Sequence, residues 1–308
     1  MFAEITNEPG FVKYVITLAS MGVMSLAVGA NSVELEAETN SEAKQPPAIW
    51  AVQINVTDLD KAINFYTKIL GMEIATREYY PVVVSLKNDG GHILLYAVDK
   101  KAQARPSKSV TYVNWQVPNL AQAIERLKAS DATLLDDEPE DFALGKSLRC
   151  LDPFGNFMNV LELDPKFGSI QKSALFNVGL PITDLESARS FYAALGINGT
   201  TDKYWPPVVP LDSRDIELIL HESETTVPLE YPGKTGAFII ITVDNIRERV
   251  KELKKLGYKF LYDEIVTHAP VGDYTALRDP FGQVVELIEP SSDNAFDKAR
   301  NLDRADAD

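Results

Sequence analysis

The stretch VTDLDKAINFYTKILG, residues 56–71, has a second copy in the chain, ITDLESARSFYAALG, residues 182–196. Both copies begin with a Thr-Asp-Leu sequence after an apolar residue, and both carry an alanine and a Phe-Tyr pair at matching later positions. The similarity continues, because YYPVVVSL at 79–86 matches YWPPVVPL at 204–211. Internal similarity of this kind indicates that the two halves of the chain are copies of one domain.

The repeated stretch has the pattern of an amphipathic helix. Leu59, Ala62, Ile63 and Tyr66 follow one another at the i, i+3, i+4 and i+7 spacing of one helix face. Asp58 precedes them as an N-cap, because its side chain can accept a hydrogen bond from a free backbone N–H of the first turn. We therefore predict a helix in this stretch and in its copy.

Each half divides once more. YVNWQVPNLAQAIERLKAS (112–130) and FIIITVDNIRERVKELKKLG (238–257) each combine an alternating strand, a polar turn and an amphipathic helix. DPFG turns at 152–155 and 279–282 precede the last strand of each half. The sequence thus predicts an α+β fold of four β-α-β-β-β modules, at about 48–100, 109–165, 174–224 and 235–290.

A helix covers only one face of each module's sheet, so the other face must meet a partner module or a ligand. Two paired modules form a curved mixed sheet with its helices outside and an open cup inside, which is the geometry of a small-molecule site. Pairing within each half gives two tandem domains, 48–165 and 174–290, followed by a polar tail at 291–308. Pairing of the first module with the fourth, and of the second with the third, is the alternative that the sequence leaves open.

Charge and cysteine content exclude some classes of function. The 308 residues include 30 Lys and Arg against 45 Asp and Glu, which gives a net charge of −15. Nucleic acids and anionic membrane surfaces would be repelled by such a protein, so neither is an expected partner. Cys150 is the single cysteine, so the chain can form neither an intrachain disulfide nor a thiolate metal cluster.

The first residues differ from the rest. The run YVITLASMGVMSLAVGA at 14–30 has no charge, which predicts a signal peptide at 1–30 and a flexible acidic linker at 31–47. The mature protein would then be exported, to a periplasm or beyond the cell, without a membrane span. Glu4 and Glu8 oppose this interpretation, and a membrane anchor or an ordinary helix of a cytoplasmic protein are the alternatives.

The repeated helix motif, the paired DPFG turns and the fourfold module order resemble the vicinal oxygen chelate superfamily over residues 48–290. This superfamily includes glyoxalase, extradiol ring-cleaving dioxygenases, and the fosfomycin and bleomycin resistance proteins. The resemblance implies two tandem glyoxalase-like domains. It does not imply one reaction, because the superfamily hosts several chemistries on one scaffold.

The resemblance also implies where a divalent metal would bind. Metal-dependent members place ligands at the inward start of each module's first strand, on the fourth strand and on the last strand. These points fall on Ala51, His92, Tyr112 and Asn159 in the first half, and on Asn177, Glu217, Phe238 and Glu286 in the second. A catalytic zinc takes three protein ligands, and a non-haem iron takes two histidines and a carboxylate. Neither module pairing supplies such a set, so we expect no metal cofactor.

Strand alternation places amide and aromatic side chains in the cups. Gln53, Asn55, Asn114 and Gln116, four amides predicted on one sheet face, would be costly to bury dry, so that face is either wet or satisfied by a ligand. The aromatic pairs Tyr79–Tyr80 and Tyr204–Trp205 form either a wall for a flat ligand or an edge-strand packing contact. The full set of predicted ligand-binding residues is Gln53, Asn55, Tyr79, Tyr80, His92, Tyr112, Asn114, Gln116, Asn159, Asn177, Tyr204, Trp205 and Phe238.

The leading prediction is a protein that binds a small organic molecule without a complete metal site. The alternative is a metal-dependent enzyme, either a glyoxalase-like lyase or isomerase or an extradiol-type dioxygenase. That enzyme would use Glu286, with Glu217 as its acid–base partner. A third hypothesis gives one domain a supporting role in a homodimer, because the edge strands of such sheets pair readily.

Overall fold

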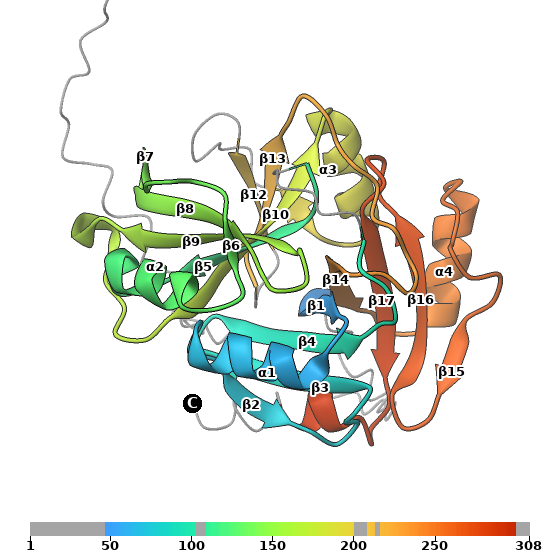
Figure 1. Cartoon of the computed structure of the whole chain (residues 1–308). Helices are drawn as coiled ribbons and strands as arrows, with labels where there is room; N and C mark the ends of the chain where they lie inside the picture. Colours follow the sequence, from blue (N-terminus) through green and yellow to red (C-terminus); the bar gives the residue numbers. More distant parts are fainter. Residues whose placement is uncertain (1–46, 103–108, 200–207, 213–215, 300–308) are drawn as a thin grey trace, which may run out of the picture. The chain divides into compact units, whose positions relative to one another are not determined.

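The computed structural model describes residues 47–102, 109–199, 208–212 and 216–299. Its strands and helices occur in the predicted order, with one helix and several strands in each of four modules (Figure 1). The predicted signal peptide and nearly all of the predicted linker lie outside the described residues, as does the pair Tyr204–Trp205. Among the described residues, no helix has the length and apolar character needed to cross a lipid bilayer.

The elements have the following bounds. Module one contains β1 (Ala48–Val56), α1 (Leu59–Lys68), β2 (Glu73–Thr76), β3 (Val83–Asn88) and β4 (Gly91–Ala97). Module two contains β5 (Tyr112–Gln116), α2 (Leu120–Lys128), β6 (Thr133–Leu134), β7 (Glu140–Phe142), β8 (Gly145–Leu151) and β9 (Phe157–Leu163), and the 3-10 helix η2 (Pro165–Phe167) follows it. Module three contains β10 (Ala174–Ile182), α3 (Leu185–Ala194), β11 (Asn198–Gly199), β12 (Val208–Asp212) and β13 (Leu218–Glu222). Module four contains β14 (Gly236–Thr242), α4 (Ile246–Lys255), β15 (Val266–His268), β16 (Gly272–Arg278) and β17 (Val284–Pro290).

A polar side chain caps the first turn of each helix. The Asp58 carboxylate accepts a hydrogen bond from the backbone N–H three residues on, at 2.9 Å, and Asp184 accepts the equivalent bond at 2.7 Å. Asn119 and Asn245 cap α2 and α4 in the same way. The two aspartates are the N-caps that the repeated sequence predicts.

The strands form two sheets, and each sheet combines one module from each half of the chain. In the first, which we call the 1–4 sheet, the strand order is β15-β16-β17-β14-β1-β4-β3-β2. In the second, the 2–3 sheet, the order is β11-β12-β13-β10-β5-β9-β8-β6, and β7 pairs with β8. The modules are joined by the antiparallel pairs β1–β14 and β10–β5. This is the second of the two pairings that the sequence leaves open.

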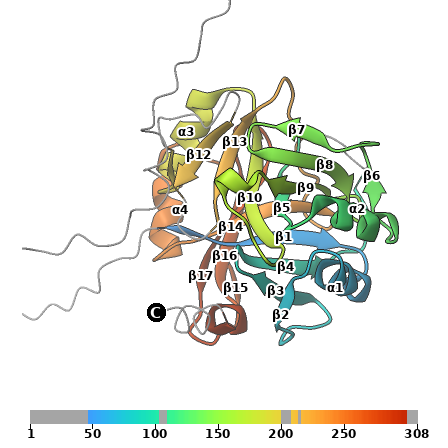
Figure 2. The same cartoon turned by 90° about the vertical axis from the view of Figure 1, so that its left-hand side faces the viewer.

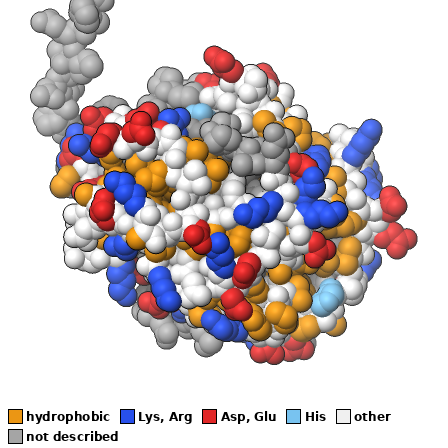
Figure 3. Space-filling model, viewed as in Figure 1, with side chains coloured by type: hydrophobic (Ala, Val, Ile, Leu, Met, Phe, Trp, Pro, Cys, Tyr) orange, Lys and Arg blue, Asp and Glu red, His pale blue; other side chains and the backbone are white. Residues whose placement is uncertain are grey.

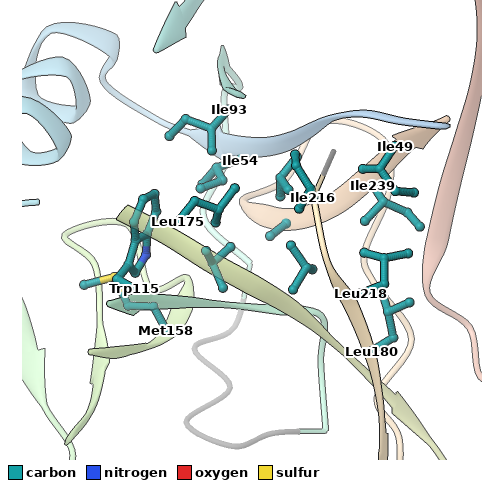
Figure 4. Close-up of a cluster of buried hydrophobic side chains, with 14 of the residues drawn as sticks. Ile49, Ile54, Ile93, Trp115, Met158, Leu175, Leu180, Ile216, Leu218 and Ile239 are labelled. Carbon is teal, nitrogen blue, oxygen red and sulfur yellow. The ribbon is translucent and has the colours of Figure 1, made fainter. Parts of the chain in front are cut away.

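The helix sides of both sheets share one hydrophobic core. Figure 4 shows Ile54 of β1 near Leu175 of β10 and Trp115 of β5, and the same buried cluster includes Ile49 and Leu180. All five side chains are buried. In the turned view of Figure 2, β1 crosses beneath β10 and β5. Because helices and core occupy one side of each sheet, the opposite sides are left for the two cups.

The DPFG turns bind the two modules of each half to each other. The buried Asp152 carboxylate accepts hydrogen bonds from two backbone N–H groups of its own turn and from the Tyr66 hydroxyl on α1, at 2.9 Å. Asp279 accepts the equivalent bonds, including one from the Tyr192 hydroxyl on α3 at 3.1 Å. Burial raises the pKa of Asp152, and it raises that of Asp279 to about 6. The motif that marks the repeat thus serves the fold, by holding modules that belong to different sheets.

Acidic and basic side chains are interspersed over the face of the molecule in Figure 3. The net charge of −15 is therefore not gathered into one patch on this face. The field of an acidic protein still favours the approach of cations over anions at long range.

Candidate functional site

The concave face of the 1–4 sheet holds a cavity of about 600 Å³, which we call the 1–4 cavity. Its floor comes from four adjacent strands, through Gln53 on β1, Leu94 on β4, Ile240 on β14 and Glu286 on β17. Volumes of this size are typical of sites for small organic molecules. Phe238, a predicted binding residue, is buried in the apolar cluster beneath it.

A larger cavity of about 810 Å³ lies beside α2, the β7–β8 hairpin and the end of β9. Its lining contains none of the predicted site residues and is formed largely by surface side chains such as Glu125 and Lys128. The 1–4 cavity is therefore the candidate site, because it alone of these two joins predicted residues from separate modules.

Glu286 reaches the cavity because of its position in β17. Val285 and Leu287, on either side of it, point into the core, so alternation directs Glu286 to the concave face. Its side chain is partly buried, and no described residue forms a hydrogen bond with its carboxyl group. Burial raises the pKa of Glu286 to about 8, because its surroundings disfavour the charged form.

Three tyrosines from separate segments surround this carboxyl group. Tyr231 precedes β14, Tyr262 follows α4, and Tyr274 lies on β16. Burial first, and the charge of Glu286 in addition, raise the pKa of all three hydroxyls. The hydroxyl oxygens of Tyr231 and Tyr262 are 2.6 Å apart, and the Tyr231 ring centroid lies 5.5 Å from that of Phe238. The aromatic wall is therefore a packed unit directly around the acid.

These three tyrosines are not among the site residues predicted from the sequence. Tyr274 lies opposite Ile288 of β17, so strand alternation could have predicted that its side chain faces the cavity. The same holds for Tyr96 on β4, which also lines the cavity. Tyr231 and Tyr262 lie in connecting segments, where no periodicity predicts the direction of a side chain.

The opposite wall combines a predicted residue with the segment after β17. The Tyr79 hydroxyl accepts a hydrogen bond from the backbone N–H of Ala295 at 3.1 Å, and its ring centroid is 4.7 Å from that of Phe296. Phe296 also contacts Trp50, whose indole N–H donates to the Asp297 carboxylate at 3.2 Å. The segment predicted as a polar tail thus contributes, as far as residue 299, a buried wall of the cavity.

The remaining predicted residues of module one differ in their roles. Gln53 donates an amide hydrogen bond to Asn55 at 2.8 Å, and both line the cavity. Tyr80 lies at its rim, with its hydroxyl donating to the Asp60 carboxylate on α1 at 3.1 Å. His92 shares the face of Leu94 but is not part of the lining, and its Nδ1 lies 3.5 Å from the Ser85 hydroxyl.

The 2–3 sheet carries a different arrangement, a row of amides bonded to one another. Asn159 donates to Asn114 at 2.7 Å, Asn114 donates to Asn177 at 2.5 Å, and Asn177 donates to the Glu217 carboxylate at 3.1 Å. These amides on the cup side are therefore satisfied largely by one another. Beside the row, the Tyr112 ring lies so close to Gly179 that an added Cβ would come within 2.1 Å of it.

Two groupings predicted from the sequence are not formed. Gln53 and Asn55 lie on the 1–4 sheet, whereas Asn114 and Gln116 lie on the 2–3 sheet, so the four amides do not share a face. For the same reason Glu217 and Glu286 do not meet in one cup as an acid–base pair. Both groupings assumed pairing within each half, and the strand order joins modules across the halves.

The family's metal positions do not fit a transition metal in either sheet. In the 1–4 sheet they are occupied by Ala51, Phe238 and Glu286, with His92 outside the cavity, and neither a methyl nor a phenyl group can coordinate. In the 2–3 sheet they are occupied by Tyr112, by the amides of Asn159 and Asn177, and by Glu217, whose carboxylate accepts a hydrogen bond from Asn177. Within the described part of the chain, no three His, Cys, Asp or Glu side chains lie close enough together to hold a metal ion.

Comparison with known proteins agrees with the module order. The sequence profile described as "Glyoxalase/Bleomycin resistance protein/Dioxygenase superfamily" matches residues 48–160 and again residues 174–287. The chain belongs to this superfamily. A comparison with curated proteins found no significant match.

Solved structures of the superfamily share the fold over most of the chain. A glyoxalase I variant from Zea mays is 20% identical, with a TM-score of 0.61, over 83% of this chain and 95% of that one. A putative dioxygenase from Bacillus subtilis is 14% identical, with a TM-score of 0.56, over 83% and 91%. Identities this low support the superfamily fold and leave the activity of this member to its own residues.

Proposed function

We propose that this superfamily member binds a small organic molecule in the 1–4 cavity without the help of a metal ion. The observation that carries the proposal is a cavity of about 600 Å³, walled by aromatic rings and containing one carboxyl group that no described residue satisfies. A partly buried carboxyl group of this kind must obtain its hydrogen bonds from a ligand or from water. The unsuitable donor set at the family's metal positions supports the metal-free part of the proposal.

The binding test uses a substitution that fills the cavity. Val271 lines the cavity from the segment before β16 and is partly buried, so Val271→Trp should place an indole ring in the space available to a ligand. We expect small organic fragments that bind the wild-type protein in chelator-treated buffer to bind this variant at least ~10-fold more weakly, a difference of about 1.4 kcal/mol. Ala121→Trp, which adds the same ring in the other cavity, is the control and should leave binding unchanged.

The metal content of the purified protein tests whether binding is independent of metal. Elemental analysis of the purified protein should find less than one equivalent of any transition metal, and binding should survive chelation. Stoichiometric metal that disappears in the Glu286→Gln variant would contradict the proposal and support the metal-dependent alternative.

A second candidate function is proton transfer by Glu286. Its pKa of about 8 is close to neutral pH, where a general base combines availability with driving force. An isomerase or lyase acting on an acidic C–H bond would need such a base beside an apolar wall. Incubation of bound fragments in D₂O should then show exchange by NMR with the wild-type protein but not with Glu286→Gln. Equal exchange in both proteins would exclude Glu286 as the base.

A further inference from the structure

We propose that the ligand of the 1–4 cavity is an organic cation, with a quaternary or alkylated ammonium group held over Glu286 among the tyrosine side chains. This inference rests on the proposed function and specifies its ligand class. We call the surrounding group the tyrosine box, and it consists of Tyr96, Tyr231, Tyr262 and Tyr274.

The charges around the cavity select a positive ligand. Glu286 is the one acidic side chain on the described floor, and Asp99 lies exposed at the rim. No Lys or Arg side chain is among the described residues that line the cavity, so an anionic group would meet no compensating charge there. Once Glu286 is ionised, above its pKa of about 8, a neutral ligand without a hydrogen-bond donor would bury the carboxylate further without pairing it, which is unfavourable. A cation instead supplies the missing counter-charge.

The tyrosine box favours a large, weakly hydrated cation. Aromatic rings attract cations through the negative potential of their faces, and quaternary ammonium groups are recognised in this way. Such a group has no N–H to donate, so it does not compete for the Tyr231 hydroxyl, which already contacts that of Tyr262 at 2.6 Å. Tyr262 in turn packs on Tyr274, with ring centroids 6.3 Å apart. Tyr231, Tyr262 and Tyr274 are therefore packed on one another, and together with Tyr96 they line the cavity with aromatic rings.

A hard metal cation fits the same space poorly. Calcium and magnesium require about six oxygen ligands at short distance. The described cavity offers one partly buried carboxyl group among rings and aliphatic side chains such as Ile240 and Ile288. A diffuse organic charge needs no such ligand set and can use the apolar surface as well.

The test compares two molecules of the same shape. Choline and 3,3-dimethylbutan-1-ol differ in the charged nitrogen that replaces a quaternary carbon. In calorimetric titrations of the full chain at pH 9, we expect choline to bind at least 10-fold more tightly than the alcohol. Glu286→Gln should remove most of that preference while leaving the affinity for the alcohol unchanged within about twofold. The control is Glu264→Gln, an exposed position outside the cavity lining, which should keep the preference.

The outcomes separate this inference from the proposed function. Equal binding of choline and the alcohol, both weakened by Val271→Trp, would overturn the cation assignment and leave the binding function intact. A choline preference that persists in Glu286→Gln would also overturn it, because the charge would then be recognised elsewhere. If neither molecule binds, the cation assignment fails, and the fragment experiment on Val271→Trp decides the proposed function by itself.

Discussion

Glu286 receives from the described residues none of the hydrogen bonds that a fold usually supplies to an inward-facing carboxyl group, and the proposed ligand would supply its partner. The β17 alternation turns it inward, and the tyrosine box lines the same cavity. Ordinary carboxyl groups in such positions accept two or three hydrogen bonds, as Asp152 and Asp279 do in this same chain. Glu286 has none from the described residues, so its environment favours the neutral form until a partner arrives.

The unfolding free energy should therefore depend on pH through Glu286. The folded protein raises the pKa of Glu286 from 4.5 to about 8. The stability that comes from the neutral carboxyl group is complete below pH 4.5 and is lost as the pH rises through 8. Because Gln cannot ionise, the unfolding free energy of Glu286→Gln relative to wild type should rise by up to about 4 kcal/mol between pH 5 and pH 9, at ~1.4 kcal/mol per pKa unit.

Denaturant unfolding at pH 5, 7 and 9 measures this difference. Glu264→Gln removes one charge at an exposed site and serves as the control for the general effect of charge on an acidic protein. If the Glu286→Gln and wild-type curves keep the same separation at all three values, the carboxyl group titrates alike in the folded and unfolded states. The other titratable groups that line the cavity are Tyr79, Tyr80, Tyr96, Asp99, Tyr231, Tyr262, His268 and Tyr274, and all are present in both proteins.

At the scale of the elements, α1 and α3 are each tied to a turn that leads into a strand of the other sheet. Tyr66 on α1 bonds to Asp152 in module two, although α1 covers the 1–4 sheet and Asp152 precedes β9 of the 2–3 sheet. Tyr192 and Asp279 repeat this link in the second half. The Phe-Tyr pair and the DPFG turn recur together in the sequence because they are the two ends of one buried hydrogen bond.

Removing that hydrogen bond should destabilise the whole fold. Tyr66→Phe leaves the ring in place but takes one donor from a buried carboxyl group, which we expect to lower the unfolding free energy by about 1–3 kcal/mol. Tyr192→Phe should behave similarly. Tyr258→Phe is the matched control, because the Tyr258 hydroxyl has no hydrogen bond to a described residue and its ring packs on Phe191. Equal losses in all three variants would assign the effect to the tyrosine rings and not to the bond.

Local sequence patterns predict most of these elements and part of the cavity. The i, i+4 spacing in α1 and the alternation in β17 follow from backbone geometry, so they fix the helix and place Glu286 inward. The positions of Tyr231 and Tyr262 depend on how connecting segments cross the finished sheet, and no local period encodes that. Phe296 was equally hidden, because one apolar residue in a polar segment carries no pattern.

At the scale of the whole molecule, the sequence repeat indicates what the modules are and leaves open which modules pair. The first strands of modules one and four, and those of modules two and three, meet along β1–β14 and β10–β5. All four of these strands are apolar on the helix side, so each could pair with any other by composition alone. Which modules pair is therefore decided by contacts between residues nearly 200 positions apart, such as Ala48 with Thr242.

This pairing predicts that the two halves interlock. A protease site placed at Gly168, in the connection between the halves, should allow the chain to be cut without separation, because each sheet still contains strands from both pieces. We expect the cut protein to elute from a sizing column as one species and to come apart only in denaturant. Two independently folded halves after cutting would contradict the observed strand order.

The 1–4 cavity is built from residues of both halves of the chain. The 1–4 cavity is shaped by the two outermost stretches, residues 50–99 and 231–296, while the intervening modules build the amide row. If one half were exchanged between two related proteins, both cups would therefore be hybrids. Each cup would combine one module from one protein with one module from the other. A change in the shape of the 1–4 cavity that involves both of its walls therefore requires substitutions in the first and in the last module of the chain.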